Sequence, residues 1–207
     1  MRIHLQGEKV ILRDIRADDM DTIYYWKYEA EDREHLNWNG PYKPLDPYTK
    51  EEYRALPRYQ ESLALVGTDA PRTELMIEID GELIGSVGRY WVSEETNWCE
   101  IGIVIYDSRY WQNGYGREAF RMWIDYLFTH MDTVRLGIGT WSGNERMIKL
   151  AAHMGMVEEA RVRKARIVRG EYYDAIKMDF ARGMGESEIT KGNPWSKQDV
   201  GTALFTC

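Results

Sequence analysis

A strand-like segment, a glycine-containing loop and an amphipathic segment, in that order, constrain the fold of this chain most strongly. The apolar segment is Cys99-Glu-Ile-Gly-Ile-Val-Ile-Tyr106, and the loop Arg109-Tyr-Trp-Gln-Asn-Gly-Tyr-Gly-Arg117 follows it. Apolar residues then recur at the three-and-four spacing of one helix face: Ala119, Phe120, Trp123, Leu127 and Met131. Residues 98–129 are therefore predicted to form a strand, a short loop and a helix.

The loop has the chemistry of an anion site. The first backbone N–H groups of a helix have no partner inside the helix, and the helix dipole places partial positive charge beside them. A phosphate or pyrophosphate fits such a position. Gly114 and Gly116 lack the side chains that would block its approach. A glycine pair at a strand-to-helix turn is also ordinary turn chemistry, so the spacing alone leaves both interpretations open.

The segments on either side predict a mixed α/β fold. Asp80-Gly81 lies between two apolar runs and is the strongest hairpin signal in the chain. Thr49 and Glu52 have the spacing of a capping box, and Pro57 is expected to kink or end the helix that they start. The predicted strands cover residues 8–15, 74–79, 83–92, 98–106, 133–141, 157–168 and 172–180. Besides the central helix, helices are predicted over residues 17–28, 49–61 and 144–154.

The chain of 207 residues suits one domain, which we assign to residues 1–182, with the tail 183–207 expected to dock on it. No apolar run approaches the ~20 residues that cross a bilayer, so no membrane partner is expected. The two cysteines and the lack of a signal peptide favour the cytoplasm. Neither the two cysteines nor the four histidines have the spacing of metal ligands.

The net charge of −7 argues against a nucleic-acid partner, because such binding depends on Lys and Arg. An acidic surface attracts cations such as amines, although solubility explains most of such charge. Carboxylates crowd one segment: Asp14, Asp18, Asp19, Asp21, Glu29, Glu31, Asp32 and Glu34. They are interpreted as a solvated helix face, with a lining for a cationic substrate as the alternative. The aromatic loop after them, from Trp38 to Tyr42, is expected to pack on the helices or to wall a pocket.

Three motifs occur in one order: Glu100-Ile-Gly102, then Tyr110-Trp-Gln-Asn-Gly-Tyr-Gly-Arg-Glu-Ala119, then Asn144 followed by Gly155-Met156. With the order of the elements, they resemble the GNAT superfamily of acyl-CoA N-acyltransferases over residues 8–181. The resemblance is greatest to the branch of ribosomal-protein N-terminal acetyltransferases and several antibiotic acetyltransferases. It implies a mixed, mostly antiparallel sheet, splayed open between its fourth and fifth strands and flanked by about four helices.

The same resemblance implies acetyl transfer from acetyl-CoA to a primary amine by direct attack. The loop amides would hold the pyrophosphate of coenzyme A, the strand before it would pair with the pantetheine arm, and Asn144 would bind near the thiol. The implied cofactor residues are Ile103, Val104, Ile105, Trp111, Gln112, Asn113, Gly114, Tyr115, Gly116 and Asn144. Asn144 is equally well explained as a helix N-cap. The acceptor would be a protein N-terminus, a polyamine or an aminoglycoside-like compound, and the protein a monomer or homodimer.

Glu100 is the preferred general base, because a carboxylate on the strand that holds the cofactor can have its pKa raised by burial. A structural carboxylate is the alternative. His153 is a weaker candidate for a catalytic group. Relatives that protonate the leaving thiolate use a tyrosine or a serine of the fourth helix, where this chain has Ala151 and Met147. A coenzyme A-binding module without catalysis therefore remains an alternative, and the Gly114 and Gly116 loop leaves a dinucleotide-binding oxidoreductase as another.

Overall fold

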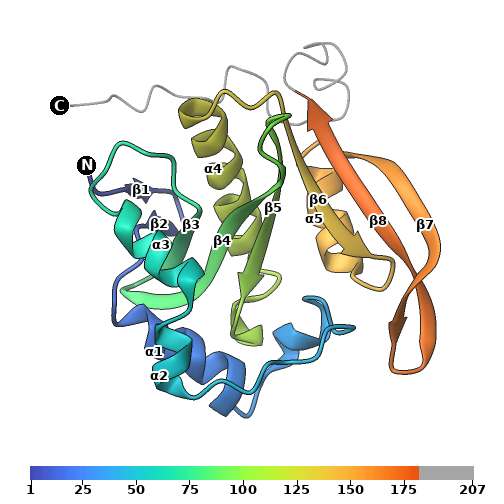
Figure 1. Ribbon diagram of the computed structural model, residues 1–207, viewed down its shortest axis with the longest axis horizontal. Coiled ribbons are helices and arrows are strands. Elements are labelled where there is room, and N and C mark those ends of the chain that lie inside the picture. Colours follow the sequence, from blue (N-terminus) through green and yellow to red (C-terminus); the bar gives the residue numbers. More distant parts are fainter. Residues whose placement is uncertain (182–207) are drawn as a thin grey trace.

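Eight strands form one open sheet in the computed structural model, which describes residues 1–181 (Figure 1). The strands are β1 (His4–Gln6), β2 (Ile11–Arg13), β3 (Glu74–Ile79), β4 (Glu82–Ser93), β5 (Trp98–Ile105), β6 (Arg135–Trp141), β7 (Val157–Val168) and β8 (Glu171–Ala181). Their order is β1-β2-β3-β4-β5-β6-β8-β7. Among the strand pairs within residues 1–181, only β5–β6 is parallel. The mixed, mostly antiparallel sheet is confirmed, and the parallel sheet of a dinucleotide-binding oxidoreductase is excluded.

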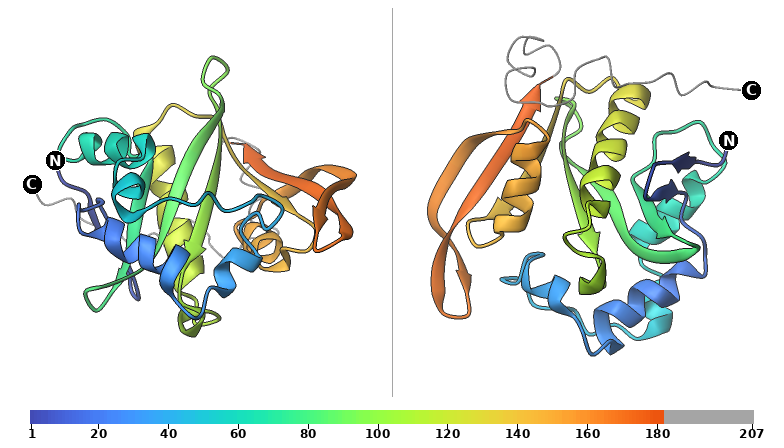
Figure 2. Two further views of the ribbon diagram at one scale, coloured as in Figure 1. Left: turned by 60° about the horizontal axis from the view of Figure 1, so that its bottom comes forward. Right: turned by 180° about the vertical axis from the view of Figure 1, so that it is seen from behind.

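Five α-helices cover the two faces of this sheet. They are α1 (Asp19–Tyr24), α2 (Lys50–Arg54), α3 (Pro57–Leu65), α4 (Tyr115–His130) and α5 (Glu145–His153). Helices α4 and α5 lie on one face, and α1 to α3 lie on the other (Figures 1 and 2). No helix among residues 1–181 has the length and hydropathy that a bilayer span needs. Three short turns complete the helical segments: η1 (Tyr25–Glu29), η2 (Glu34–Asn37) and η3 (Ser108–Tyr110).

Two predicted boundaries at the N-terminal end were wrong. The single strand expected over residues 8–15 is the second half of a hairpin, in which β1 pairs with β2 and the Gly7 N–H donates to the Val10 carbonyl at 2.9 Å. Each strand has only three residues, too few for a period-2 pattern to be recognised. The helix expected over residues 49–61 is interrupted before Pro57, as its proline predicted, but Pro57 then starts a second helix, so that the range is divided into α2 and α3. Residues 1–181 therefore contain five α-helices, in keeping with the expected number of about four.

Two apolar cores hold β5 from opposite faces. The first lies under α4 and contains Phe120, Trp123 and Leu127, each wholly buried. The second lies under α1 to α3 and contains Tyr53 and Tyr106. Burial of one large apolar side chain contributes roughly 1.5–3 kcal/mol, so strands packed on both faces are the most strongly held part of the sheet. The fold therefore holds β5 firmly.

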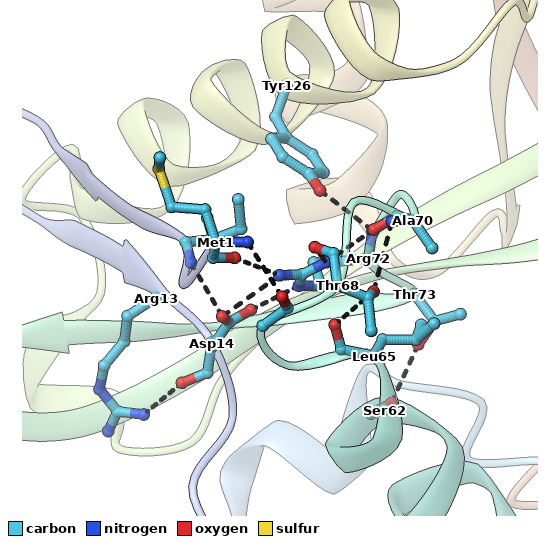
Figure 3. Close-up of polar contacts among 12 residues, drawn as sticks. Met1, Arg13, Asp14, Ser62, Leu65, Thr68, Ala70, Arg72, Thr73 and Tyr126 are labelled. Carbon is cyan, nitrogen blue, oxygen red and sulfur yellow. Dashed lines mark hydrogen bonds and ion pairs between the residues drawn. The ribbon is translucent and has the colours of Figure 1, made fainter. Parts of the chain in front are cut away.

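A buried ion pair fixes the start of β3. The Arg72 guanidinium donates to Asp14 at 2.7 Å, to the Ala70 carbonyl at 2.6 Å and to the Met1 carbonyl at 2.9 Å (Figure 3). The Arg72 backbone N–H donates to the Tyr126 hydroxyl of α4 at 3.0 Å. Since these contacts satisfy the buried charges, the first residues of β3 have a defined position against α4.

Strands β5 and β6 lie together at one end and diverge toward the other (Figure 1). Their pairing is limited to Cys99 with Leu136 and Glu100 with Gly137. Beyond Glu100, β6 continues beside β8 and leaves β5. The predicted opening between the fourth and fifth strands is confirmed, and it falls between β5 and β6 because the first predicted strand is in fact two.

Candidate active site

A cavity of about 1280 Å³ lies at the opening of the sheet. Strands β4, β5 and β6, helix α5, the glycine loop and the segment 38–43 all contribute to its walls. Its volume exceeds the roughly 300–1,000 Å³ of an ordinary small-molecule pocket, so it can hold an extended molecule together with a second one.

The glycine loop brings an uncapped helix N-terminus to this cavity. Gly114 has φ +86°, and α4 begins at the next residue without a side-chain cap. The first N–H groups of α4 are consequently available to an anion. The loop is held from outside by Lys9, whose ammonium group donates to the Asn113 carbonyl at 3.2 Å. Gln112 also has a positive φ, of 67°, so two positions of the loop adopt the left-handed conformation.

The splayed edge of β5 adjoins this loop. Trp111 folds back on the strand, and its indole N–H donates to the Ile105 carbonyl at 3.1 Å. A Cβ on Gly116 would lie 3.8 Å from the side chains of Ile103 and Ile105. Of the residues predicted for the pyrophosphate and for the pantetheine arm, all but Asn113 and Tyr115 line one wall of the cavity, in which Trp111 already uses the Ile105 carbonyl.

Three cations of this wall were not recognised in the sequence. Arg117 of α4 and Arg146 and Lys149 of α5 line the cavity. The Arg146 guanidinium lies between two indole rings, 4.5 Å from the ring centre of Trp111 and 5.2 Å from that of Trp38. The only local signal was their position near the starts of two predicted helices, which by itself does not distinguish a ligand contact from a solvated face.

Asn144 is the N-cap of α5, as one of its two interpretations predicted. Its side-chain oxygen accepts from the Met147 N–H at 3.1 Å, and its amide N–H donates to the Trp38 carbonyl at 3.1 Å. Trp141 donates to the same carbonyl at 3.0 Å. The segment after η2 is thus bound to the end of β6 and to the start of α5, where Trp38 and Asn144 both line the cavity.

Glu100 lies where β5 and β6 separate, and it is only 2% exposed. Its carboxylate accepts a hydrogen bond of 2.6 Å from the Tyr90 hydroxyl and forms an ion pair with Lys177. Tyr90 is half exposed and lines the cavity. Burial, with this hydrogen bond to Glu100, raises the pKa of Tyr90. The predicted base is therefore part of an assembly of three side chains, two of which the sequence did not indicate.

Gly139 gives access to this carboxylate. It is an exposed residue of β6 that lines the cavity, and a Cβ there would lie 2.7 Å from the Glu100 Oε2 atom. Glu100 itself does not line the cavity, but Tyr90 and Gly139 do, and the glycine places no side chain between the cavity and the carboxylate.

Of the other predicted candidates, His153 lines the cavity and the acidic segment does not. His153 is exposed, and its Nδ1 atom lies 2.6 Å from the Lys149 carbonyl oxygen. None of the eight carboxylates between positions 14 and 34 lines the cavity. Asp14, Asp19 and Asp21 are paired with arginines at 2.6–2.7 Å, so much of this acidic segment serves the fold. Among residues 1–181, no three His, Cys, Asp or Glu side chains are grouped as metal ligands.

His35, in η2, is a cavity residue that the sequence did not single out. It is 6% exposed, and among the described residues its Nδ1 atom has no hydrogen-bond partner. Burial lowers the pKa of His35, although a hydrogen bond with the Tyr106 backbone opposes this shift. The imidazole is consequently neutral in the folded protein at physiological pH.

A neutral buried histidine makes stability depend on pH. Since the folded-state pKa of His35 is below its usual 6.5, the unfolded chain binds this proton first as the pH falls. Its contribution to stability is therefore complete above about pH 6.5 and is lost below it. Thermal unfolding between pH 8 and 5 should show a smaller loss of Tm on acidification for His35→Asn than for the wild type. Equal losses would mean that His35 does not titrate in this range.

The chain belongs to the GNAT family, because residues 9–157 match the model of the acetyltransferase (GNAT) domain. Over 183 residues it is 25% identical to an uncharacterized N-acetyltransferase p20 of Bacillus licheniformis, covering 86% of this chain and 98% of that protein. Solved structures of two acetyltransferases have the same fold.

One is the ribosomal-protein-S5-alanine acetyltransferase of Vibrio fischeri, with a TM-score of 0.71 and 21% identity over 88% of this chain and 98% of that one. Another is a spermidine N-acetyltransferase of Vibrio cholerae in complex with coenzyme A and spermine. Its TM-score is 0.68, with 20% identity over 85% of this chain and 97% of that one.

Proposed function

We propose that this protein transfers an acetyl group from acetyl-CoA to a primary amine. The observation that carries the proposal is one cavity that joins three features. These are the uncapped start of α4 at Gly114, the splayed edge of β5, and the Tyr90 hydroxyl, which is bonded to the buried Glu100 where the strands separate. The first two suit a long anionic cofactor, and the third suits proton transfer.

The direction of the cofactor follows from the order of these features along the chain. The glycine loop comes after the end of β5, so the pyrophosphate on the amides of Gln112 to Gly116 lies at the Ile105 end of the strand. The pantetheine arm would then run along Ile105, Val104 and Ile103 toward Gly102. The thioester would lie close to where β6 joins β5 at Glu100. Arg117, Arg146 and Lys149 supply positive charge for the phosphates, and Asn144 faces the same channel.

In this arrangement the neutral amine attacks the thioester carbonyl, the new C–N bond forms, and the C–S bond breaks. The proton of the amine passes to Glu100, either across Gly139 or through the Tyr90 hydroxyl. Helix α5 has no hydroxyl side chain, and Tyr90 is a hydroxyl of the cavity wall already bonded to Glu100. We therefore assign to Tyr90 a relay: its hydroxyl gives a proton to the departing thiolate and takes the amine's proton back from Glu100, so that the thiol, the tyrosine and the carboxylate are restored. Much of the acceleration comes from holding the amine and the thioester in line.

The nature of the acceptor is supported by the named proteins of the same fold, which act on a ribosomal protein and on spermidine. Both acceptors present an amine. A protein N-terminus, a polyamine or an aminoglycoside-like compound therefore remains the acceptor class, and the cytoplasm the expected compartment. A coenzyme A-binding module without catalysis is the alternative, because Ala151 and Met147 occupy the positions of the hydroxyl residues that some relatives use.

An acceptor screen tests the proposal. Purified protein with acetyl-CoA is expected to release free thiol in the presence of at least one class of amine: polyamines, aminoglycosides, or peptides with a free N-terminus. Mass spectrometry of the acceptor should show one added acetyl group. Binding of acetyl-CoA without thiol release across the whole panel would favour the inactive module, and a lack of binding would contradict the proposed cofactor.

A further inference from the structure

A buried carboxylate lines the cavity on the face of the sheet opposite to α4. Glu74 is the first residue of β3 and lines the cavity. Its Oε1 atom is buried and has no hydrogen-bond partner among the described residues. An unpartnered buried carboxylate oxygen costs free energy, so a donor supplied by a ligand would stabilise it.

The cation whose charge acts on Glu74 is Arg58, and its hydrogen bonds go to other residues. Arg58 of α3 donates to the Tyr59 hydroxyl at 2.6 Å and to the Tyr53 hydroxyl at 3.2 Å, and it stacks on the Tyr59 ring at 4.3 Å. No ion pair of Glu74 is present within residues 1–181. Burial raises the pKa of Glu74, while hydrogen bonding to Ser62 and the charge of Arg58 oppose the shift and Asp19 reinforces it. The carboxylate lacks a cation of its own.

Gly88 and Gly102 form a floor of the cavity between Glu74 and the opening of the sheet. Glu74 is opposite Gly88 of β4, and Gly88 is opposite Gly102 of β5, so the three residues form one row across the sheet. Both glycines line the cavity. A Cβ on Gly102 would meet nothing within 4 Å, and one on Gly88 would lie 3.8 Å from the Glu74 Cβ. Two interstrand spacings place Glu74 about 10 Å from Gly102.

The fold holds this end of the floor in place. Thr73, directly before Glu74, shares a hydrogen bond of 2.9 Å with Ser62 of α3, and Arg72 is fixed by Asp14 (Figure 3). On the other side of the row, Ser86 of β4 bonds the Tyr106 hydroxyl at 3.1 Å. A carboxylate on so constrained a backbone can select a ligand by length.

We propose that Glu74 binds a second amino group of the acceptor, so that the preferred substrate is a linear diamine. This inference rests on the proposed function, because the first amino group is the one acetylated beside Gly102. Extended chains gain about 1.2 Å per bond, so about 10 Å corresponds to roughly eight bonds between the two nitrogens. 1,7-Diaminoheptane has this length, and heptylamine is its match without the second cation.

The test compares kcat/KM for these two amines with acetyl-CoA held constant. The wild type should prefer 1,7-diaminoheptane by about 10- to 100-fold, the range for a hydrogen bond to a charged group. Glu74→Gln should reduce this ratio to about one, through a higher KM for the diamine. Glu61→Gln is the matched control, because Glu61 also lines the cavity but is exposed, and it should keep the wild-type ratio.

A second variant covers the case in which Glu74→Gln fails to fold. Gly88→Ala adds one methyl group to the floor, within ordinary contact distance of its neighbours, and should lower the rate with the diamine more than with the monoamine. Equal kcat/KM values for the two amines in the wild type would overturn the inference while leaving the proposed function intact. If no amine is acetylated, the proposed function fails, and calorimetric titration of both amines then decides on Glu74. Equal affinities for the two amines would overturn its role.

Discussion

Acetyl-CoA at a free concentration 100 times its dissociation constant should stabilise the wild-type protein by about 2.7 kcal/mol, and Gly116→Val should remove most of this stabilisation. The valine side chain would project from the first turn of α4 toward Ile103 and Ile105, where the cofactor is expected to pass. The measurement is the shift in Tm on adding acetyl-CoA. Gly114→Val should have the same effect, but its φ of +86° makes any side chain there a source of strain as well.

Thr129→Val is the matched control for this experiment. Thr129 is exposed near the other end of α4, where its hydroxyl donates to the Asp125 carbonyl at 2.7 Å. A β-branched residue in the same helix should leave the shift caused by acetyl-CoA intact. A full shift in well-folded Gly116→Val would place the cofactor somewhere other than this loop.

Glu100→Gln should slow acetyl transfer by about 10²-fold or more, almost entirely in kcat. The substitution keeps the size of the side chain and a hydrogen-bond partner for Tyr90, but it removes the group that takes up the proton. The KM for acetyl-CoA should change little, because the carboxylate acts on the amine. Steady-state rates over a range of pH, with a saturating acceptor from the screen, provide the measurement.

Glu158→Gln serves as the comparison, since Glu158 of β7 forms an ion pair at the surface with Arg161 at 2.7 Å and should have no effect on turnover. A Glu100→Gln enzyme with nearly wild-type turnover at every pH would identify Glu100 as a structural partner of Lys177. Alignment of the substrates would then account for most of the rate.

The elements that could be predicted from the sequence are those with a strong local signal. Asp80 and Gly81 have φ values of 51° and 84°, both positive as a two-residue hairpin turn requires. Thr49 and Glu52 form both hydrogen bonds of the capping box. The strand, glycine loop and helix at the centre of the chain combine two periodicities with glycines between them, so their order was also predictable.

Contacts between distant residues could not be predicted in the same way. Glu100 was recognised as a candidate base, but its partner Lys177 is 77 residues away and reaches it only because β8 pairs with β6. The acidic segment at positions 14–34 looked like one surface. Its members were divided by the fold, since Asp14 and Asp19 face buried arginines. Glu74 had no distinguishing neighbour in sequence, and only the register of three strands aligns it with two glycines.

The Trp38 carbonyl oxygen accepts hydrogen bonds from both Trp141 and Asn144, and these bonds fix one wall of the cavity in place. The segment that carries Trp38 completes the cap of α5, so it cannot swing away from the cavity as a hinged lid does without breaking two hydrogen bonds. The conformational entropy of ordering this wall is accordingly lost once, when the chain folds, and not again at each encounter with an amine. Binding would then be faster and less dependent on rearrangement than in enzymes that close over their substrates.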